Sequence, residues 1–117
     1  MIAGSYLEKT LFVKVDRLIK RISSREILYL TCEGNVSQIH LVDGGEMTCT
    51  RLLKLFEEDL AGAGFCRVNH NCLVNLEKVE EIHYIDARKR QLILTGGVVT
   101  DISYRKWKAV KSALLGK

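Results

Sequence analysis

Short apolar stretches separated by turn residues fill most of this chain of 117 residues. Each stretch alternates apolar and polar residues or is apolar throughout, which is the pattern of short β-strands. Glycine marks the breaks, and the turn Asp43-Gly44-Gly45 joins two neighbouring stretches as a hairpin does, so the order predicts antiparallel pairing. The expected strands are LFVKV (11–15), LIKRIS (18–23), ILYLTC (27–32), VSQIHL (36–41), EMTCT (46–50), FCRV (65–68), VEEIHYI (79–85), QLIL (91–94) and VVTDI (98–102).

One internal segment has the helical period instead. Between residues 51 and 60, the apolar positions 52, 53, 56 and 60 fall on one face. Thr50 is placed to cap the start of this helix, and Gly62 is placed to end it.

A second helical segment closes the chain. From Ser103 onward, one face is apolar and another is basic. The apolar face holds Trp107, Val110 and Leu114, and the basic face holds Arg105, Lys108 and Lys111. No linker, repeat or low-complexity stretch interrupts the pattern. We therefore predict one mainly-β domain with an internal helix and a C-terminal helix.

The net charge of +4 is unevenly distributed. Residues 1–60 hold 8 Lys and Arg against 9 Asp and Glu, which gives −1, whereas residues 61–117 hold 10 against 5, which gives +5. A basic second half favours an anionic partner, although a basic face can also be simply solvated.

Composition indicates an ordinary globular protein, with 47% apolar and 27% charged residues. No apolar run approaches the ~20 residues that cross a bilayer. The start, MIAGSYLEKT, lacks the basic and long apolar stretches of a signal peptide. We expect a soluble, cytoplasmic protein. The four cysteines, at 32, 49, 66 and 72, form no CxxC pair, so we expect reduced thiols.

The stretch FCRVNHNCLVN, residues 65–75, allows three kinds of chemistry. Cys66, His70 and Cys72 could bind a metal, but no pair here has the spacing of a zinc site. Cys72 and His70 could form a nucleophile and its base, but Cys72 lies in the apolar run CLV and is expected to be buried. We therefore expect no metal, no cofactor and no catalysis.

The third use of this stretch is recognition of a nucleic acid. Asn and His side chains carry both hydrogen-bond donors and acceptors, which suits them to reading base edges. Arg67 and nearby basic residues could engage phosphates. The same asparagines could instead close a turn by satisfying backbone groups. The local sequence leaves both readings open.

Three ordered motifs resemble the LytTR family, the DNA-binding output domains of many bacterial two-component response regulators. FCRVNHNCLVN followed by LEKVEEI is similar to the family's F-x-R-V/C-H-R/N-S-Y/F-I/V-V-N and the isoleucine-bearing strand after it. ILYLTCEGNVSQIHL resembles the family's strand pair I-x-Y-I/L-E-A/S-x-x-N-Y-V-x-I/V-H, and ISYRKWKAVKSAL resembles its C-terminal V/I-S-R-R motif. The resemblance covers about residues 11–115.

The resemblance implies an elongated β-β-β fold of about ten short, mostly antiparallel strands with a small helical component. It implies that double-stranded DNA is read by loops, which enter successive major grooves on one face of a bent duplex. Two copies of such a domain usually bind paired half-sites, often direct repeats. The implied function is sequence-specific DNA binding in the regulation of bacterial transcription.

Carried over by position, three loops and the following helix would contact DNA. These positions are Asn35, Val36 and Ser37; Arg67, Asn69, His70 and Asn71; Ser103, Tyr104, Arg105 and Lys106; and Lys108. Arg67 could equally form a structural ion pair. Asn75 is expected to cap or close its loop, and Tyr104 and Trp107 are expected to serve mainly in packing.

The central loop departs from the family pattern. The family's usual His-Arg-Ser is Asn69-His70-Asn71 here, and the aromatic residue that usually follows is Cys72. Val36 stands where a polar or aromatic residue is common. These changes leave the expected fold intact, but they make the DNA target unpredictable.

Residues 1–10 are expected to be an N-terminal extension, and residues 11–117 the LytTR-like domain. No receiver domain fits in the segment before the first strand. The chain is therefore expected to be a stand-alone regulator or an excised output domain. The alternative is a LytTR-like protein-interaction module that has lost DNA binding.

Overall fold

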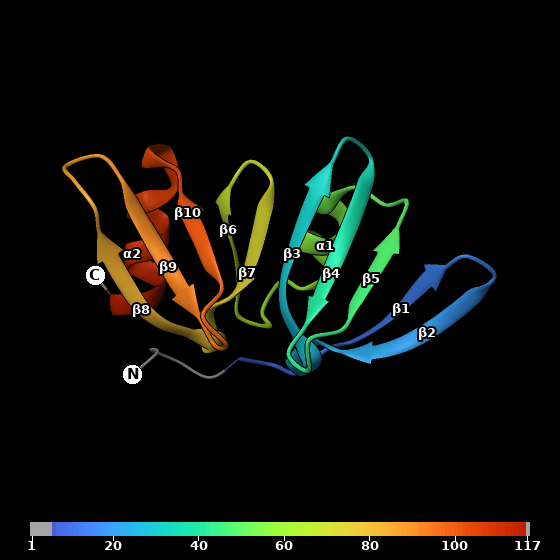
Figure 1. Ribbon diagram of the computed structural model, residues 1–117. Helices are drawn as coiled ribbons and strands as arrows, with labels where there is room; N and C mark the ends of the chain where they lie inside the picture. Colours follow the sequence, from blue (N-terminus) through green and yellow to red (C-terminus); the bar gives the residue numbers. More distant parts are fainter. Residues whose placement is uncertain (1–5, 117) are drawn as a thin grey trace.

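The computed structural model describes residues 6–116, so residues 1–5 of the expected extension and Lys117 lie outside the described part. Within that part the chain forms ten strands and two α-helices (Figure 1). The strands are β1 (Thr10–Val15), β2 (Leu18–Ser23), β3 (Ile27–Glu33), β4 (Val36–Leu41), β5 (Glu46–Cys49), β6 (Phe65–Asn69), β7 (Cys72–Asn75), β8 (Val79–Tyr84), β9 (Arg90–Leu94) and β10 (Val99–Ile102). The helices are α1 (Leu53–Asp59) and α2 (Trp107–Leu115), and short 3-10 turns cover Ser24–Glu26, Leu76–Lys78 and Tyr104–Lys106.

The strands form three antiparallel sheets side by side. A two-stranded sheet holds β1 and β2, a five-stranded sheet has the order β5-β4-β3-β7-β6, and a three-stranded sheet has the order β10-β9-β8. The described chain is elongated, with extents of 46 × 30 × 24 Å. The predicted mainly-β architecture, with one internal and one C-terminal helix, is confirmed (Figure 1).

Strand β7 lies inside the five-stranded sheet, between β3 and β6. All four of its residues are buried, so its sequence CLVN shows no alternation between apolar and polar positions. A strand covered on both faces loses that alternation. For this reason CLV was recognised only as a buried apolar run and was not among the predicted strands.

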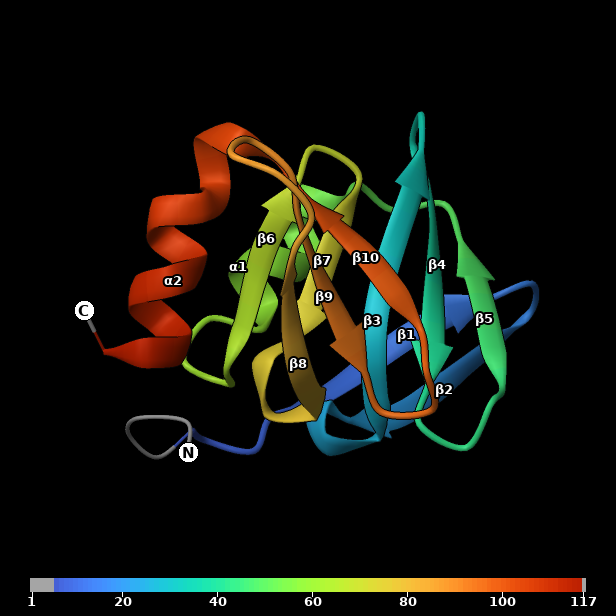
Figure 2. The ribbon, with the colours of Figure 1, turned by 60° about the vertical axis from the view of Figure 1, so that its left-hand side comes forward.

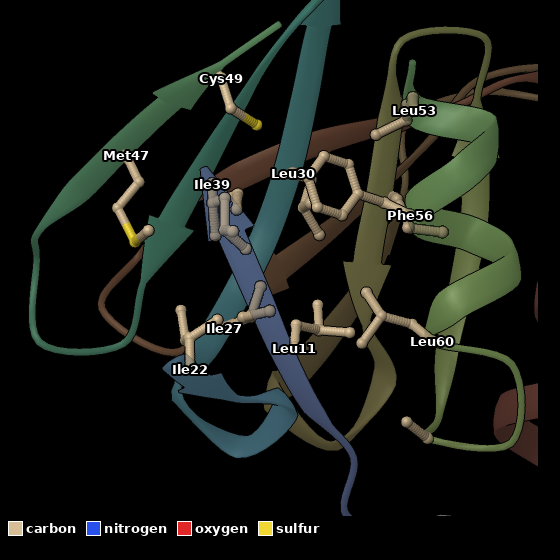
Figure 3. Packing of buried hydrophobic residues seen from close by; sticks show 13 residues of the cluster. Leu11, Ile22, Ile27, Leu30, Ile39, Met47, Cys49, Leu53, Phe56 and Leu60 are labelled. Carbon is tan, nitrogen blue, oxygen red and sulfur yellow. The ribbon is translucent and has the colours of Figure 1, made fainter. Parts of the chain in front are cut away.

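Two hydrophobic cores lie on opposite sides of β7, because successive side chains of a strand point to opposite faces. Leu73 belongs to the core beneath α1, whereas Val74 belongs to the core beneath α2. In the first core, Phe56 and Leu60 extend from α1 toward Leu30 of the central sheet and Leu11 of the β1–β2 hairpin (Figure 3). In the second core, α2 lies beside β6 (Figure 2), and its buried Val110 belongs to the same cluster as Leu92 of β9.

Helix α1 starts later than predicted. Leu52 keeps an extended backbone, with φ −67° and ψ 142°, and the Arg51 carbonyl accepts a hydrogen bond from Ser37 Oγ. The chain is therefore still leaving the sheet at residues where the helix was expected. Thr50 does not cap the helix; the N-cap position is Leu52, whose side chain makes no cap hydrogen bond.

The buried stripe of α1 is correspondingly narrower than predicted. Leu53, Phe56 and Leu60 are buried, but Leu52 is 49% exposed. The helix ends at Asp59, and Gly62 adopts φ +84° in the turn that follows. A positive φ of this size favours glycine, which explains how the chain reverses into β6.

Helix α2 has the predicted apolar face. Val110 and Leu114 are buried, and Trp107 is half-buried. A 3-10 turn precedes the helix, and Ser103 caps that turn by accepting a hydrogen bond from the Lys106 N–H at 3.3 Å. No helix among residues 6–116 is both long and apolar enough to span a membrane.

Candidate DNA interface

Three segments lie along one edge of the molecule, the upper edge in Figure 1. They are the β3–β4 turn (34–35), the β6–β7 turn (70–71) and segment 103–106 before α2, which together we call the loop edge. Two backbone hydrogen bonds connect these segments to one another. The Cys32 N–H donates to the Asn71 carbonyl at 3.0 Å, and the Ser103 N–H donates to the Val68 carbonyl at 2.9 Å. The three loops expected to contact DNA are therefore neighbours.

The β6–β7 turn is fixed by Asn69. Its Nδ2 donates to the Asp101 carbonyl at 2.8 Å, and its Oδ1 accepts from the Asn71 N–H at 2.8 Å. Both ends of the amide are thus engaged within the protein, one across to β10 and one inside the turn. Asn69 positions the turn, and its amide has little capacity left for a base.

Arg67 supports the same turn from below. Its guanidinium bonds Glu57 of α1 at 2.9 Å, and its side chain is only 17% exposed. It also donates two hydrogen bonds to the His70 carbonyl. Of the two roles considered for Arg67, the structure shows the internal ion pair.

The exposed tip of the turn consists of His70 and Asn71. The His70 side chain lines a shallow hollow together with Ser103, Arg105 and Lys106. Asn71 lines a neighbouring hollow with residues of β3 and β4. In that hollow Asn71 Oδ1 has only a long contact of 3.9 Å with the Cys32 thiol. Both side chains are therefore presented at the loop edge with hydrogen-bonding capacity to spare.

Asn35 in the β3–β4 turn and Val36 at the start of β4 are exposed, but the next residue, Ser37, is not. Ser37 has no exposed surface, and its hydroxyl donates to the Arg51 carbonyl. The Ser37 side chain therefore serves within the fold, and the structure offers it no surface for the predicted DNA contact. Its position in β4 places it on the same inward face as Ile39, two residues later.

Segment 103–106 contributes the positive charge of the loop edge. Tyr104, Arg105 and Lys106 are exposed, and so is Lys108 in the first turn of α2. None of the ion pairs found among residues 6–116 involves these three cations. Ser103 is half-buried and serves as the cap described above.

Two residues that support the β6–β7 turn were not predicted from the sequence. Glu57 holds Arg67, and the Asp101 carbonyl holds Asn69. Glu57 lies on a helix and Asp101 on a strand of another sheet, so no local motif links them to the turn. The only signal in the sequence was an acidic residue, Glu57, that could pair with the arginine ten residues later.

The arrangement around Cys72 does not suit nucleophilic catalysis. Cys72 is 5% exposed, and burial raises the pKa of its thiol to about 12, so the thiol stays protonated at neutral pH. His70 lies at the exposed tip of the turn, whereas Cys72 packs into the core beneath α2. Among residues 6–116, no three His, Cys, Asp or Glu side chains gather closely enough to hold a metal ion.

The chain is thus a mainly-β domain that presents polar and cationic loops along one edge. The LytTr DNA-binding domain model matches residues 16–115, and the chain belongs to this family. Family membership supports double-stranded DNA as the partner and a binding rather than a catalytic role.

A solved structure has the same fold. It is the LytTr DNA-binding domain of a Bacillus cereus protein named as a methyl-accepting/DNA response regulator. The two share 17% sequence identity and superpose with a TM-score of 0.79, over 97% of this chain and 100% of that one. A search of the curated proteins found no match.

Proposed function

We propose that this domain binds double-stranded DNA sequence-specifically through the loop edge and regulates transcription in bacteria, alone or as the output domain of a response regulator. The observation that carries this proposal is the juxtaposition of the exposed His70-Asn71 tip with the cations of segment 103–106. Side chains suited to reading base edges and side chains suited to binding phosphates thus lie on one surface.

His70 and Asn71 supply the base-reading groups. A neutral imidazole donates from one nitrogen and accepts at the other, so guanine N7 is a suitable acceptor for its N–H. The Asn71 amide can donate and accept together, which matches adenine in the major groove. Asn35 offers the same chemistry from the neighbouring turn.

Arg105, Lys106 and Lys108 supply the electrostatic attraction. They are exposed, and they belong to the basic second half of the chain, which carries a net charge of +5 from 10 Lys and Arg against 5 Asp and Glu. Cations that approach the DNA phosphates release bound counterions, and the affinity therefore falls as the salt concentration rises. A second copy on an adjacent half-site, in direct repeat, would double the contact length.

The test combines selection and salt titration. Fragments bound from a random DNA pool should converge on a motif, and the selected duplex should bind more tightly than its scrambled counterpart. If about five phosphates are neutralised, a fourfold rise in salt should lower affinity by about 2.7 log units. No enrichment together with a flat salt response would overturn the proposal.

One observation favours the alternative, a protein-interaction module without DNA binding. Phe12 and Ile19 on the β1–β2 hairpin are each 70% exposed and lie near each other on its outer face. Exposed apolar side chains that cluster are typical of protein contacts. The salt titration separates the two functions, because only DNA binding predicts a steep slope.

A further inference from the structure

The β8–β9 loop, residues 85–89, reaches the same edge of the molecule but has no part in the interface described above. Figure 2 shows this loop arching over toward the start of α2. It carries two exposed cations, Arg88 and Lys89. In the sequence, these two residues lie in the short break between the predicted strands 79–85 and 91–94.

The loop is closed by its own hydrogen bonds. Asp86 Oδ1 accepts from the Arg88 N–H at 2.8 Å and from the Lys89 N–H at 2.9 Å. The Lys89 carbonyl in turn accepts from the Ile85 N–H at 2.9 Å. The two N–H donors lower the pKa of Asp86, whose carboxylate is thereby occupied within the loop. The two cations therefore project from a preformed turn.

Arg88 stacks on an aromatic residue of the loop edge. Its guanidinium carbon lies 4.2 Å from the centre of the Tyr104 ring, which is itself 56% exposed. A stacked guanidinium keeps its edge N–H groups free for an oxygen acceptor. The contact ties the loop to Tyr104, which Arg105 and Lys106 follow directly in the chain.

A second stack fixes the base of the loop. The Arg90 guanidinium carbon lies 4.7 Å from the Trp107 ring centre and 5.1 Å from that of Tyr84. Arg90 also donates to the Ala87 carbonyl at 3.2 Å. Arg90 is half-buried against these two rings and joins the loop to α2, which leaves Arg88 and Lys89 as the exposed cations of the loop.

We propose that Arg88 and Lys89 form a further DNA contact, which binds backbone phosphates beside the groove that receives the loop edge. The proposal rests on the proposed function. Phosphate is the proposed ligand because the loop, Ile85-Asp86-Ala87-Arg88-Lys89, offers positive charge and no amide or hydroxyl side chain. Contact of Arg88 or Lys89 with guanine is the alternative that the experiment below separates. Tyr104 acts as a positioning residue for Arg88.

The experiment compares two double variants with the wild type on the selected and the scrambled duplex. The test variant is Arg88→Ala/Lys89→Ala, and the matched control is Lys14→Ala/Arg21→Ala, which removes the same charges from the exposed hairpin. Both melting temperatures are measured first. If two phosphates are lost, the slope of log affinity against log salt should become shallower by about 1.8 in the test variant. The control slope should stay near that of the wild type.

Each outcome decides a stated point. An equal loss of affinity on both duplexes supports phosphate binding, whereas a loss confined to the selected duplex overturns it in favour of base reading. An unchanged slope, or one matched by the control, removes the loop from the interface. Absence of DNA binding by the wild type would instead overturn the proposed function itself.

A double-mutant cycle tests the role of Tyr104. Tyr104→Phe keeps the ring beneath Arg88 and should preserve the slope, whereas Tyr104→Leu removes the stack. In the Tyr104→Leu background, Arg88→Ala should cost less affinity than it does in the wild type. Additive effects would overturn the positioning role of Tyr104.

Discussion

Arg67 and the backbone carbonyl of His70 face each other across the β6–β7 turn. The guanidinium donates two hydrogen bonds to this one oxygen, from Nη2 at 2.7 Å and from Nε at 3.2 Å, while Nη1 bonds Glu57 at 2.9 Å. A cation of the central sheet thus fixes the turn that exposes His70. If the loop edge binds DNA as proposed, Arg67 would support recognition by holding the backbone of the turn and not by touching DNA.

Arg67→Ala should therefore lower stability and leave the salt slope of DNA binding unchanged. Charged hydrogen bonds of this kind contribute about 1–3 kcal/mol to the free energy of unfolding. Arg105→Ala is the matched comparison: its stability should change by less than about 0.5 kcal/mol. Its salt slope should fall by about 0.9 if it binds one phosphate. Urea unfolding and a salt titration of both variants check this. A shallower slope for Arg67→Ala would show that it binds phosphate after all.

His70→Ala should weaken binding to the preferred site by about 1–3 kcal/mol and relax the preference at one or two base pairs. Stability should be nearly unchanged, because the side chain is exposed and Arg67 bonds only the backbone oxygen of this residue. Parallel selections on the wild type and the variant measure the preference. Identical selected motifs would remove His70 from the reading surface.

The sequence predicted most of the fold, because half-buried strands keep a visible alternation. In β4, for example, Ile39 is buried between the more exposed Gln38 and His40, as the period of two requires. Strand β7 lacked this signal because both of its faces are covered. The start of α1 was misplaced because a tertiary hydrogen bond from Ser37 to the Arg51 carbonyl delays the helix.

The site was predicted less completely than the fold. The capping role of Asn75 is confirmed: its Oδ1 accepts from the Glu77 N–H at 3.1 Å, and its Nδ2 donates to the Ile27 carbonyl at 2.9 Å. Ser37 was assigned to the DNA contact from its place in the family motif. Its spacing of two residues from Ile39 already placed its side chain on the buried face of the strand. The bond from Asn69 to Asp101 spans 32 residues, and local sequence carries no signal for such a contact.

Leu73→Ala should cost about 2–5 kcal/mol of stability, since it removes a fully buried side chain from the core beneath α1. Leu52→Ala is the control, because Leu52 is 49% exposed despite its place in the predicted stripe. Its free energy of unfolding should change by less than about 0.5 kcal/mol. Equal losses in the two variants, measured by urea unfolding, would contradict the packing described here.

Stability should also decline as pH falls through the range in which His40 titrates. The His40 ring stacks on Tyr29, with centroids 4.1 Å apart, and bonds Thr31 Oγ1 at 3.0 Å and Glu46 at 3.0 Å. Burial lowers the pKa of His40, and the Glu46 carboxylate opposes this only in part. The unfolded chain, whose His40 pKa is near 6.5, therefore binds the proton more readily than the folded chain.

The stability that neutral His40 contributes is thus fully present above about pH 6.5 and is lost as pH falls through the lower folded-state pKa. Urea unfolding at pH 7.5 and at successive steps down to pH 5 measures this decline. His40→Gln has no group that titrates here and should show a smaller decline over the same interval. If stability instead rises as the pH falls, the attraction of Glu46 for the imidazolium outweighs burial. A decline of the same size in wild type and variant would assign the effect to other groups.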